Sequence, residues 1–294
     1  MFQGSIPALI TPFKNGEVDR KAFADLVERQ IENGAGGLVP CGTTGESATL
    51  SHEEHREVVS LCIEVTAGRI PVIAGAGSNS TREAIGLVQH AKDAGADAAL
   101  CVCPYYNRPD QAGLEAHFRA IADTVALPII LYNVPGRTST NINADTVVRL
   151  SRIPNIVGIK EASSDPTQIA QIIRDSQDDF NVWSGNDDET FPIMCVGGYG
   201  VVSVASNLYG NQIKTMMGLI LEGNIESAAS EHKRLLPIFK ALFWVTNPIP
   251  VKYAVNRAGF RAGKNRLPLC DADEDFRSKF DGIMDQYEVD LPVN

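Results

Sequence analysis

The sequence lacks any long hydrophobic run. None of its apolar segments approaches the ~18 consecutive residues that a membrane-spanning helix needs. Residues 1–6 also lack the basic-then-apolar order of a secretory signal peptide. We therefore expect a soluble cytoplasmic protein that does not act at a membrane.

Positive charge is also scarce. The 294 residues carry 26 Lys and Arg against 36 Asp and Glu, which gives a net charge of −10, and they form no basic cluster. Nucleic acids and anionic membranes are bound through basic patches, so the composition argues against both classes of partner. The chain is nevertheless long enough to bury a sizeable core.

Cysteine and histidine are too scattered to predict a metal site. The six cysteines include no CxxC pair, and Cys101 and Cys103, which alternate on a predicted strand, have no further ligand nearby. Only His52 and His55 are close among the five histidines, and their i, i+3 spacing fits either a ligand pair or a solvated helical turn. We expect no metal, and we interpret the cysteines as reduced core residues.

Strand and helix patterns alternate eight times along the chain. The predicted strands cover residues 5–11, 37–40, 71–75, 98–103, 128–133, 156–162, 182–185 and 200–205, with amphipathic helices between them. Short connections and no antiparallel hairpin signal indicate an α/β fold, the (β/α)8 TIM barrel, which typically has ~250 residues. A doubly wound sheet is the alternative, but residues 75–80 lack the third glycine of its fingerprint.

The chain beyond residue 208 holds no strand pattern of comparable strength. Residues 216–221, 228–244, 251–258 and 276–287 have helical patterns, which predict helices appended to the barrel. We therefore divide the chain into a catalytic barrel, residues 1–223, and a C-terminal helical extension, residues 224–294.

A lysine stands where the sixth strand should end. Residues 156–159 (Ile-Val-Gly-Ile) read as a strand buried on both faces, and Lys160 follows directly. An ammonium is costly to desolvate, and the neutral amine that forms when it loses a proton can make a Schiff base with a ketone. The alternative is that Lys160 is only the first exposed residue after the strand.

Other polar side chains follow the remaining strands. In a barrel, the carboxyl ends of the strands converge on one site. Thr43 and Thr44, between glycines, form either an ordinary turn or a cradle for a carboxylate. Tyr132 is either a satisfied core phenol or a proton shuttle, and Arg137 is either a loop charge or a partner for a second carboxylate.

Five segments resemble one family. They are Gly-Thr-Thr-Gly-Glu-Ser at 42–47, Pro-Tyr-Tyr-Asn at 104–107, Tyr-Asn-Val-Pro-Gly-Arg-Thr at 132–138, Gly-Ile-Lys-Glu at 158–161 and Asn-Pro-Ile-Pro-Val-Lys at 247–252. Together they resemble the 4-hydroxy-tetrahydrodipicolinate synthases, and the likeness runs nearly end to end. The threonine and lysine segments alone indicate only the pyruvate-dependent class I aldolase superfamily, which includes N-acetylneuraminate lyase; Tyr106 and Arg137 are more specific to the synthases.

The resemblance implies condensation of pyruvate with L-aspartate 4-semialdehyde in lysine and diaminopimelate biosynthesis, without an external cofactor. Lys160 would form the Schiff base with pyruvate, and Tyr132, Thr43 and Tyr106 would form a proton relay, with Tyr106 supplied by a neighbouring subunit. The remaining substrate-binding residues would be Thr44 for the pyruvate carboxylate, Arg137 for that of the semialdehyde, and Gly185 and Val202 lining the pyruvate pocket.

The resemblance also implies feedback inhibition by lysine. The effector pocket would lie at a subunit interface and would be formed by Ser47, Ala48, His52, His55, Asn79, Glu83 and Tyr105. Glu83 would pair with an ammonium group of the effector. Family members are typically homotetramers built as dimers of dimers, and a relay residue from a neighbour requires at least a dimer.

Two other functions stay open at this point. A related aldolase would use another acceptor, such as a sugar acid, and Arg137 argues against it. A barrel that binds a keto acid without turnover would have no use for the proton relay of Tyr132 and Thr43.

Overall fold

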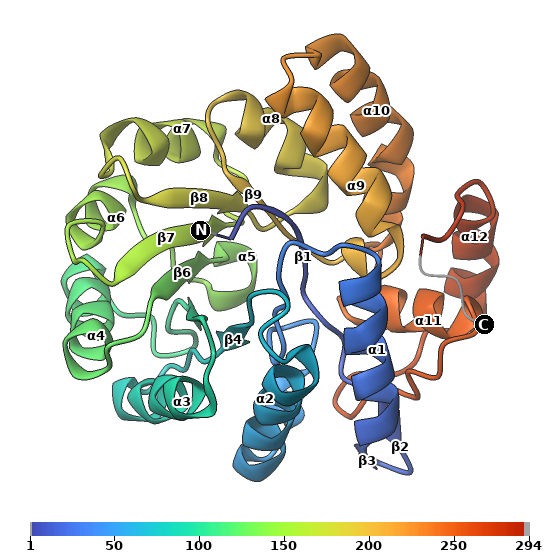
Figure 1. Ribbon diagram of the computed structural model, residues 1–294, viewed down its shortest axis with the longest axis horizontal. Coiled ribbons are helices and arrows are strands. Elements are labelled where there is room, and N and C mark those ends of the chain that lie inside the picture. The colour runs from blue at the N-terminus through green and yellow to red at the C-terminus, as the bar shows by residue number, and fades with distance from the viewer. Residues whose placement is uncertain (1, 291–294) are drawn as a thin grey trace.

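The structure is a computed structural model that describes residues 2–290. Its main sheet has seven parallel strands in the spatial order β1-β9-β8-β7-β6-β5-β4. These strands are β1 (Gly4–Pro7), β4 (Ile73–Gly75), β5 (Ala98–Val102), β6 (Ile129–Asn133), β7 (Ile156–Glu161), β8 (Asn181–Ser184) and β9 (Gly200–Ser203). Figure 1 shows them at the centre of a ring of helices.

Residues 37–40 occupy the gap between β1 and β4. Val39 forms a parallel bridge with Ala8, and Leu38 forms one with Val72. The predicted strand is therefore present only as two isolated bridges. Pro40 has no N–H to donate to a ladder, which limits regular pairing in so short a segment. These bridges close the sheet on itself, and the predicted (β/α)8 barrel with added C-terminal helices is confirmed.

Most of the helices surround the barrel (Figure 1). They are α1 (Arg20–Glu32), α2 (His52–Thr66), α3 (Thr81–Ala94), α4 (Gln111–Thr124), α5 (Pro135–Thr138), α6 (Ala144–Leu150), α7 (Pro166–Asp175), α8 (Thr190–Cys195), α9 (Ser206–Leu221), α10 (Ile225–Ala241), α11 (Ile249–Arg257) and α12 (Glu274–Met284), with 3-10 turns at Ser47–Thr49 and Asp187–Glu189. Along residues 2–290, no helix combines the length and apolarity needed to cross a bilayer.

Local capping fixes where several of these helices begin or end. Asp19 accepts a hydrogen bond from the Ala22 amide at the start of α1. Ser51 and Glu54 form a reciprocal capping box at the start of α2. Gly95, with φ +94°, ends α3 in the left-handed conformation that glycine adopts without strain.

Two further features of the fold differ from the prediction. A small antiparallel hairpin, β2 (Phe13–Lys14) with β3 (Glu17–Val18), is present although none was expected. Asn15 and Gly16 both have positive φ there, which is the signature of the tight turn that joins such strands.

The helix expected at residues 216–221 is the second difference. It is the end of α9, which begins at Ser206 and packs on β1 as the eighth barrel helix. Polar and glycine residues in its first half (Asn207, Gly210, Asn211) hide the apolar spacing there. The division at residues 223 and 224 stays a prediction, and residues 291–294 of the extension lie outside the described residues.

Side chains inside the barrel form a core of their own. It includes Ile6, Val39, Ile130, Tyr132 and Trp183, while most other apolar side chains fill the layer between the sheet and the helices. The Trp183 indole donates to the Phe2 carbonyl at 2.8 Å. Because successive strand residues face opposite sides, Ile159 packs outward and Lys160 points into the barrel.

Candidate active site

Lys160 lies inside the barrel near the carboxyl end of β7. The strand register places it beside Tyr132 of β6 and Trp183 of β8. The residue is 5% exposed, and its Nζ lies 4.2 Å from the centroid of the Tyr132 ring. Within residues 2–290 its amine makes no ion pair or hydrogen bond, so the terminal strand position predicted from the sequence holds a buried amine.

Gly185 leaves the space that Lys160 occupies. A Cβ built on Gly185 would lie 2.8 Å from the Ala162 Cβ and 3.1 Å from the Lys160 Cε. Any side chain at residue 185 would therefore clash with Ala162 and crowd the Lys160 side chain. The two residues border a cavity of about 40 Å³ whose lining includes Ala8, Val39, Gly42, Thr43, Thr44, Leu100, Tyr132, Val134, Arg137, Lys160, Gly185, Asn186, Val204, Phe243 and Asn247.

Thr43 and Thr44 reach this cavity from a compact turn at residues 42–47. The Gly45 amide donates to the Gly42 carbonyl at 3.1 Å, and the Glu46 amide donates to the Thr43 carbonyl at 3.1 Å. The Thr11 hydroxyl, which follows β1, donates to the Gly45 carbonyl at 2.7 Å. The turn is thus fixed from within and from the neighbouring strand.

Asn247 links the turn to Arg137, and the sequence analysis gave it no role. Its Nδ2 donates to the Thr44 hydroxyl at 3.0 Å, and its carbonyl accepts from Arg137 Nη2 at 3.1 Å. Asn247 is 4% exposed and borders the cavity. Its place in the segment at 247–252, which carries part of the family resemblance, was the available signal in the sequence.

Two of the candidate residues lie apart from this cavity. Tyr106 is 91% exposed, has a φ of +69° and is absent from the lining of its own chain's cavity among the described residues. Val202 is buried in the inner core, and Val204, two residues later, lines the cavity instead. Both roles stay predictions.

A second, larger cavity of about 590 Å³ adjoins the first. Thr43, Tyr132 and Arg137 border both cavities. The candidate effector residues that line the larger cavity are Ser47, Ala48, His52, His55, Glu83 and Tyr105. Asn79 lies beside this group, where its Nδ2 donates to the Tyr105 carbonyl at 3.2 Å.

The two histidines of this group differ in environment. His52 is exposed, and its Nε2 lies 3.3 Å from Glu83 Oε1. His55 is buried, its Nε2 lies 2.9 Å from the Gly75 carbonyl, and its Nδ1 has no partner among the described residues. Burial lowers the pKa of His55 to about 4, so its ring is neutral at pH 7. No cluster of three metal-ligating side chains forms in residues 2–290.

Glu161 carries a buried carboxylate on the outer face of β7. It accepts hydrogen bonds from the Ser163 amide at 2.8 Å, from Asn133 Nδ2 at 3.1 Å and from Gln168 Nε2 at 3.4 Å. Burial raises the pKa of Glu161 to about 6, and these donors oppose the rise. The network anchors the strand end that carries Lys160.

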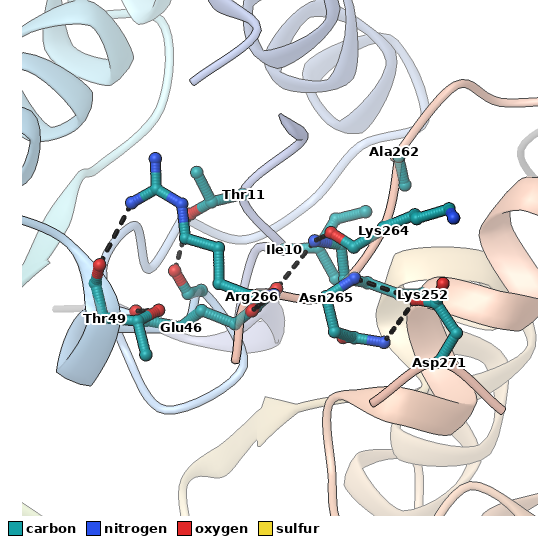
Figure 2. Close-up of polar contacts among 12 residues, drawn as sticks. Ile10, Thr11, Glu46, Thr49, Lys252, Ala262, Lys264, Asn265, Arg266 and Asp271 are labelled. Atoms are coloured by element: carbon teal, nitrogen blue, oxygen red, sulfur yellow. Dashed lines mark hydrogen bonds and ion pairs between the residues drawn. The ribbon is translucent and has the colours of Figure 1, made fainter. Parts of the chain in front are cut away.

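A buried ion pair lies behind the threonine turn (Figure 2). The Lys252 ammonium of α11 lies 2.6 Å from Glu46 Oε1, and both side chains are 1% exposed. Glu46 Oε2 accepts from the Arg266 amide at 2.9 Å. Burial lowers the pKa of Lys252, and the Glu46 carboxylate acts against that effect.

Known proteins resemble this chain over nearly its whole length. The chain matches the model of the dihydrodipicolinate synthetase family over residues 1–287. It is 52% identical over 286 residues to the 4-hydroxy-tetrahydrodipicolinate synthase of Hyphomonas neptunium, covering 97% of this chain and 98% of the relative. The predicted family resemblance is confirmed.

Solved structures agree. The dihydrodipicolinate synthase of Acinetobacter baumannii complexed with pyruvate is 44% identical, with a TM-score of 0.95 over 97% of this chain and 99% of that one. The enzyme of Cyanidioschyzon merolae with lysine bound is also 44% identical, with a TM-score of 0.95 over 97% of this chain and 98% of that one. Sequence and fold together lead to one conclusion: this chain belongs to the dihydrodipicolinate synthetase family of enzymes.

Proposed function

We propose that this chain condenses pyruvate with L-aspartate 4-semialdehyde to 4-hydroxy-tetrahydrodipicolinate through a Schiff base on Lys160. The observation that carries the proposal is the buried, unpaired amine of Lys160 in a cavity that Thr43, Thr44 and Tyr132 also line. Membership of the family supports the choice of substrates, as does the A. baumannii relative complexed with pyruvate.

The first step forms the imine. The neutral amine of Lys160 attacks the ketone carbon of pyruvate, and loss of water from the carbinolamine leaves a C=N bond in place of C=O. Tyr132 and Thr43 carry protons to and from the leaving oxygen. Hydroxyls of Thr43 and Thr44, with free amides of their turn, hold the pyruvate carboxylate. Gly185 leaves room for the adduct, and Val202 supports the pocket from the inner core.

The second step forms the carbon–carbon bond. The imine withdraws electrons, so a methyl proton of pyruvate leaves and the resulting enamine attacks the aldehyde carbon. Arg137, at the mouth of the cavity, binds the carboxylate of the semialdehyde. The amino group of the acceptor then attacks the imine carbon, closes the ring and releases Lys160. This chemistry uses only groups on the chain and its substrates.

Borohydride trapping tests the proposal. Reduction of an imine yields a stable secondary amine, which peptide mass spectrometry locates. Incubation with pyruvate and borohydride should give one adduct on Lys160. Lys160→Met should give none, whereas Lys279→Met, which removes an exposed lysine paired with Asp275 on α12, should keep the adduct on Lys160. Folded wild-type protein that gives no adduct would contradict the proposal and favour a keto-acid binder without turnover.

A different acceptor is the competing activity. An aldolase of the same superfamily that acts on a sugar acid would share Lys160 and Tyr132. Arg137, tied to Asn247 at 3.1 Å, favours an acceptor with a carboxylate close to the reacting carbon. Parallel assays with aspartate semialdehyde and with N-acetylneuraminate separate the two, because turnover of only the second compound would overturn the assignment of the acceptor.

Inhibition by lysine is a further part of the proposal. The larger cavity joins residues of the candidate effector group to Thr43 and Tyr132, and Glu83 offers a carboxylate for an ammonium. The C. merolae relative with lysine bound supports the same ligand. Activity should fall as lysine is titrated into the assay, and Glu83→Gln should weaken the effect. Full activity at millimolar lysine would reject it.

We also propose that the chain acts as a homotetramer in which Tyr106 completes the relay of a neighbouring subunit. Its exposed phenol in a strained backbone suits a residue that inserts elsewhere. Tyr106→Phe and Lys160→Met should each be inactive alone. Mixed after dissociation and reassociation, they should regain activity in roughly one site in four, because a mixed pair contains one intact site. Mixtures that stay inactive would contradict a role across subunits.

A further inference from the structure

Glu46 occupies an unusual position in the threonine turn. Its backbone adopts the left-handed conformation, with φ +55° and ψ +35°, which residues other than glycine rarely adopt. Its amide donates to the carbonyl of Thr43 at 3.1 Å. The side chain of Glu46 must therefore supply contacts that hold the turn in this conformation.

These contacts come from the far end of the chain. The Glu46 carboxylate binds the Lys252 ammonium through one oxygen and the Arg266 amide through the other. Lys252 Nζ also donates to the Lys264 carbonyl at 2.9 Å and lies 4.3 Å from the centroid of the Phe13 ring. A carboxylate whose side chain is only 1% exposed is thus paired with a cation and a second donor, as burial requires.

The Arg266 side chain clamps the segment that follows the turn (Figure 2). Its Nη1 donates to the Thr49 carbonyl at 3.0 Å and to Glu54 Oε2 at 2.7 Å. Its guanidinium lies 4.1 Å from the centroid of the Phe13 ring. Residues 46–54 are therefore held at several points by a segment more than 200 residues later in the chain.

We propose that Glu46 is a positioning residue for the condensation: its carboxylate, held by Lys252 and by the Arg266 amide, fixes the turn so that Thr43 and Thr44 face Lys160. The inference rests on the proposed function. Glu46 itself lines only the larger cavity and acts through the two threonines.

Glu46→Gln tests the inference because glutamine keeps the size of the side chain but has only one oxygen, so it cannot accept hydrogen bonds from both Lys252 and the Arg266 amide. Misplacement of a substrate-binding group by about 1 Å costs up to about 100-fold, so kcat/KM for pyruvate should fall about 10- to 100-fold. Imine formation with pyruvate, followed by borohydride trapping, should slow by the same factor. KM for the semialdehyde should change little, since Arg137 is held by Asn247.

The matched control is Asp285→Asn. Asp285 pairs with Arg257 of α11 at 2.6 Å, so this variant weakens the same C-terminal segment without touching the turn. It should leave kcat/KM for pyruvate within about twofold of the wild-type value. A merely structural role for Glu46 would make the two variants behave alike.

If Glu46→Gln does not fold, the double variant Glu46→Gln/Lys252→Met removes the unpaired ammonium as well and is assayed in its place. A rate of imine formation equal to that of the wild type in the folded variant would overturn the inference. Wild-type protein that forms no imine would instead overturn the proposed function, so the two failures are distinguishable.

Discussion

Two lysines are buried in this protein, and they have different surroundings. Lys160 is 5% exposed and Lys252 is 1% exposed. Lys252 has a carboxylate at 2.6 Å and a carbonyl at 2.9 Å. Lys160 has only the face of the Tyr132 ring at 4.2 Å. The charge of the Lys252 ammonium is thus balanced by the Glu46 carboxylate, whereas Lys160 has no carboxylate partner in residues 2–290.

The difference follows from where each lysine stands. Lys160 is near the end of an inner strand, where the neighbouring strands offer Tyr132 and Trp183. Lys252 is on a helix outside the barrel, in reach of a turn and a C-terminal loop that supply oxygen atoms. A buried amine without a counter-charge lowers stability but is available to react with a substrate. A buried amine that is paired with a carboxylate lowers stability less and is held in the ion pair.

The largest expected effect is the loss of activity in Lys160→Met. Without the amine no imine forms, and kcat should fall on the order of 10⁴-fold or more. Stability should be unchanged or higher, because a buried amine without a hydrogen-bond partner among residues 2–290 is replaced by an apolar side chain of similar length. Steady-state kinetics and thermal unfolding measure the two effects, and a marked drop in Tm would contradict the comparison.

Lys252→Met should mainly reduce stability, whereas Lys160→Met mainly removes activity. It leaves the Glu46 carboxylate buried without its cation, which costs about 3–5 kcal/mol of unfolding free energy. Denaturant unfolding measures this loss directly. Adding Glu46→Gln should recover part of it. Unchanged stability in the single variant would mean that the ion pair contributes nothing net.

The smallest effect is a pH dependence that concerns the anchor of the Lys160 strand. Burial raises the pKa of Glu161 from 4.5 to about 6, so the native state holds this proton more tightly than the unfolded chain. The stability that Glu161 contributes is present in full below pH 4.5 and is lost as the pH rises through 6. This loss amounts to roughly 2 kcal/mol.

Glu161→Gln cannot ionise and should lack that loss. Between pH 4.5 and 7, the unfolding free energy of the wild type should therefore fall by roughly 2 kcal/mol relative to that of the variant. Other groups that titrate in the window, such as Asp187, cancel in the difference. Parallel pH profiles would contradict the assigned shift.

Local signals in the sequence were enough for much of the fold. The helices Thr81–Ala94 and Gln111–Thr124 lie between predicted strands as expected, and a capping side chain at the start or a glycine at the end sets the bounds of each locally. The hairpin at Phe13–Val18 was missed although Asn15-Gly16 was a usable signal. Residues 37–40 lack regular pairing because Pro40 has no N–H to donate to a ladder.

Only those site residues that lie at the ends of predicted strands could be predicted from the sequence. Lys160, Thr43 and Tyr132 follow apolar runs, and barrel topology brings such positions together. Glu46 and Lys252 are 206 residues apart, and no periodic pattern connects them. Nor does any pattern place Asn247 against Thr44. Contacts between distant segments depend on the packed tertiary structure, which a single sequence does not show.

The long separation between Glu46 and its partners also orders events on the ribosome. The barrel strands are complete once Ser203 has been made, yet the amide that binds Glu46 belongs to Arg266, 220 residues after it. At about 5–20 residues per second, the interval is roughly 10 to 45 s. Until Lys252 and Arg266 have been made, the Glu46 carboxylate of the nascent turn lacks both of these partners, so the turn that carries Thr43 and Thr44 is completed well after the strands of the barrel.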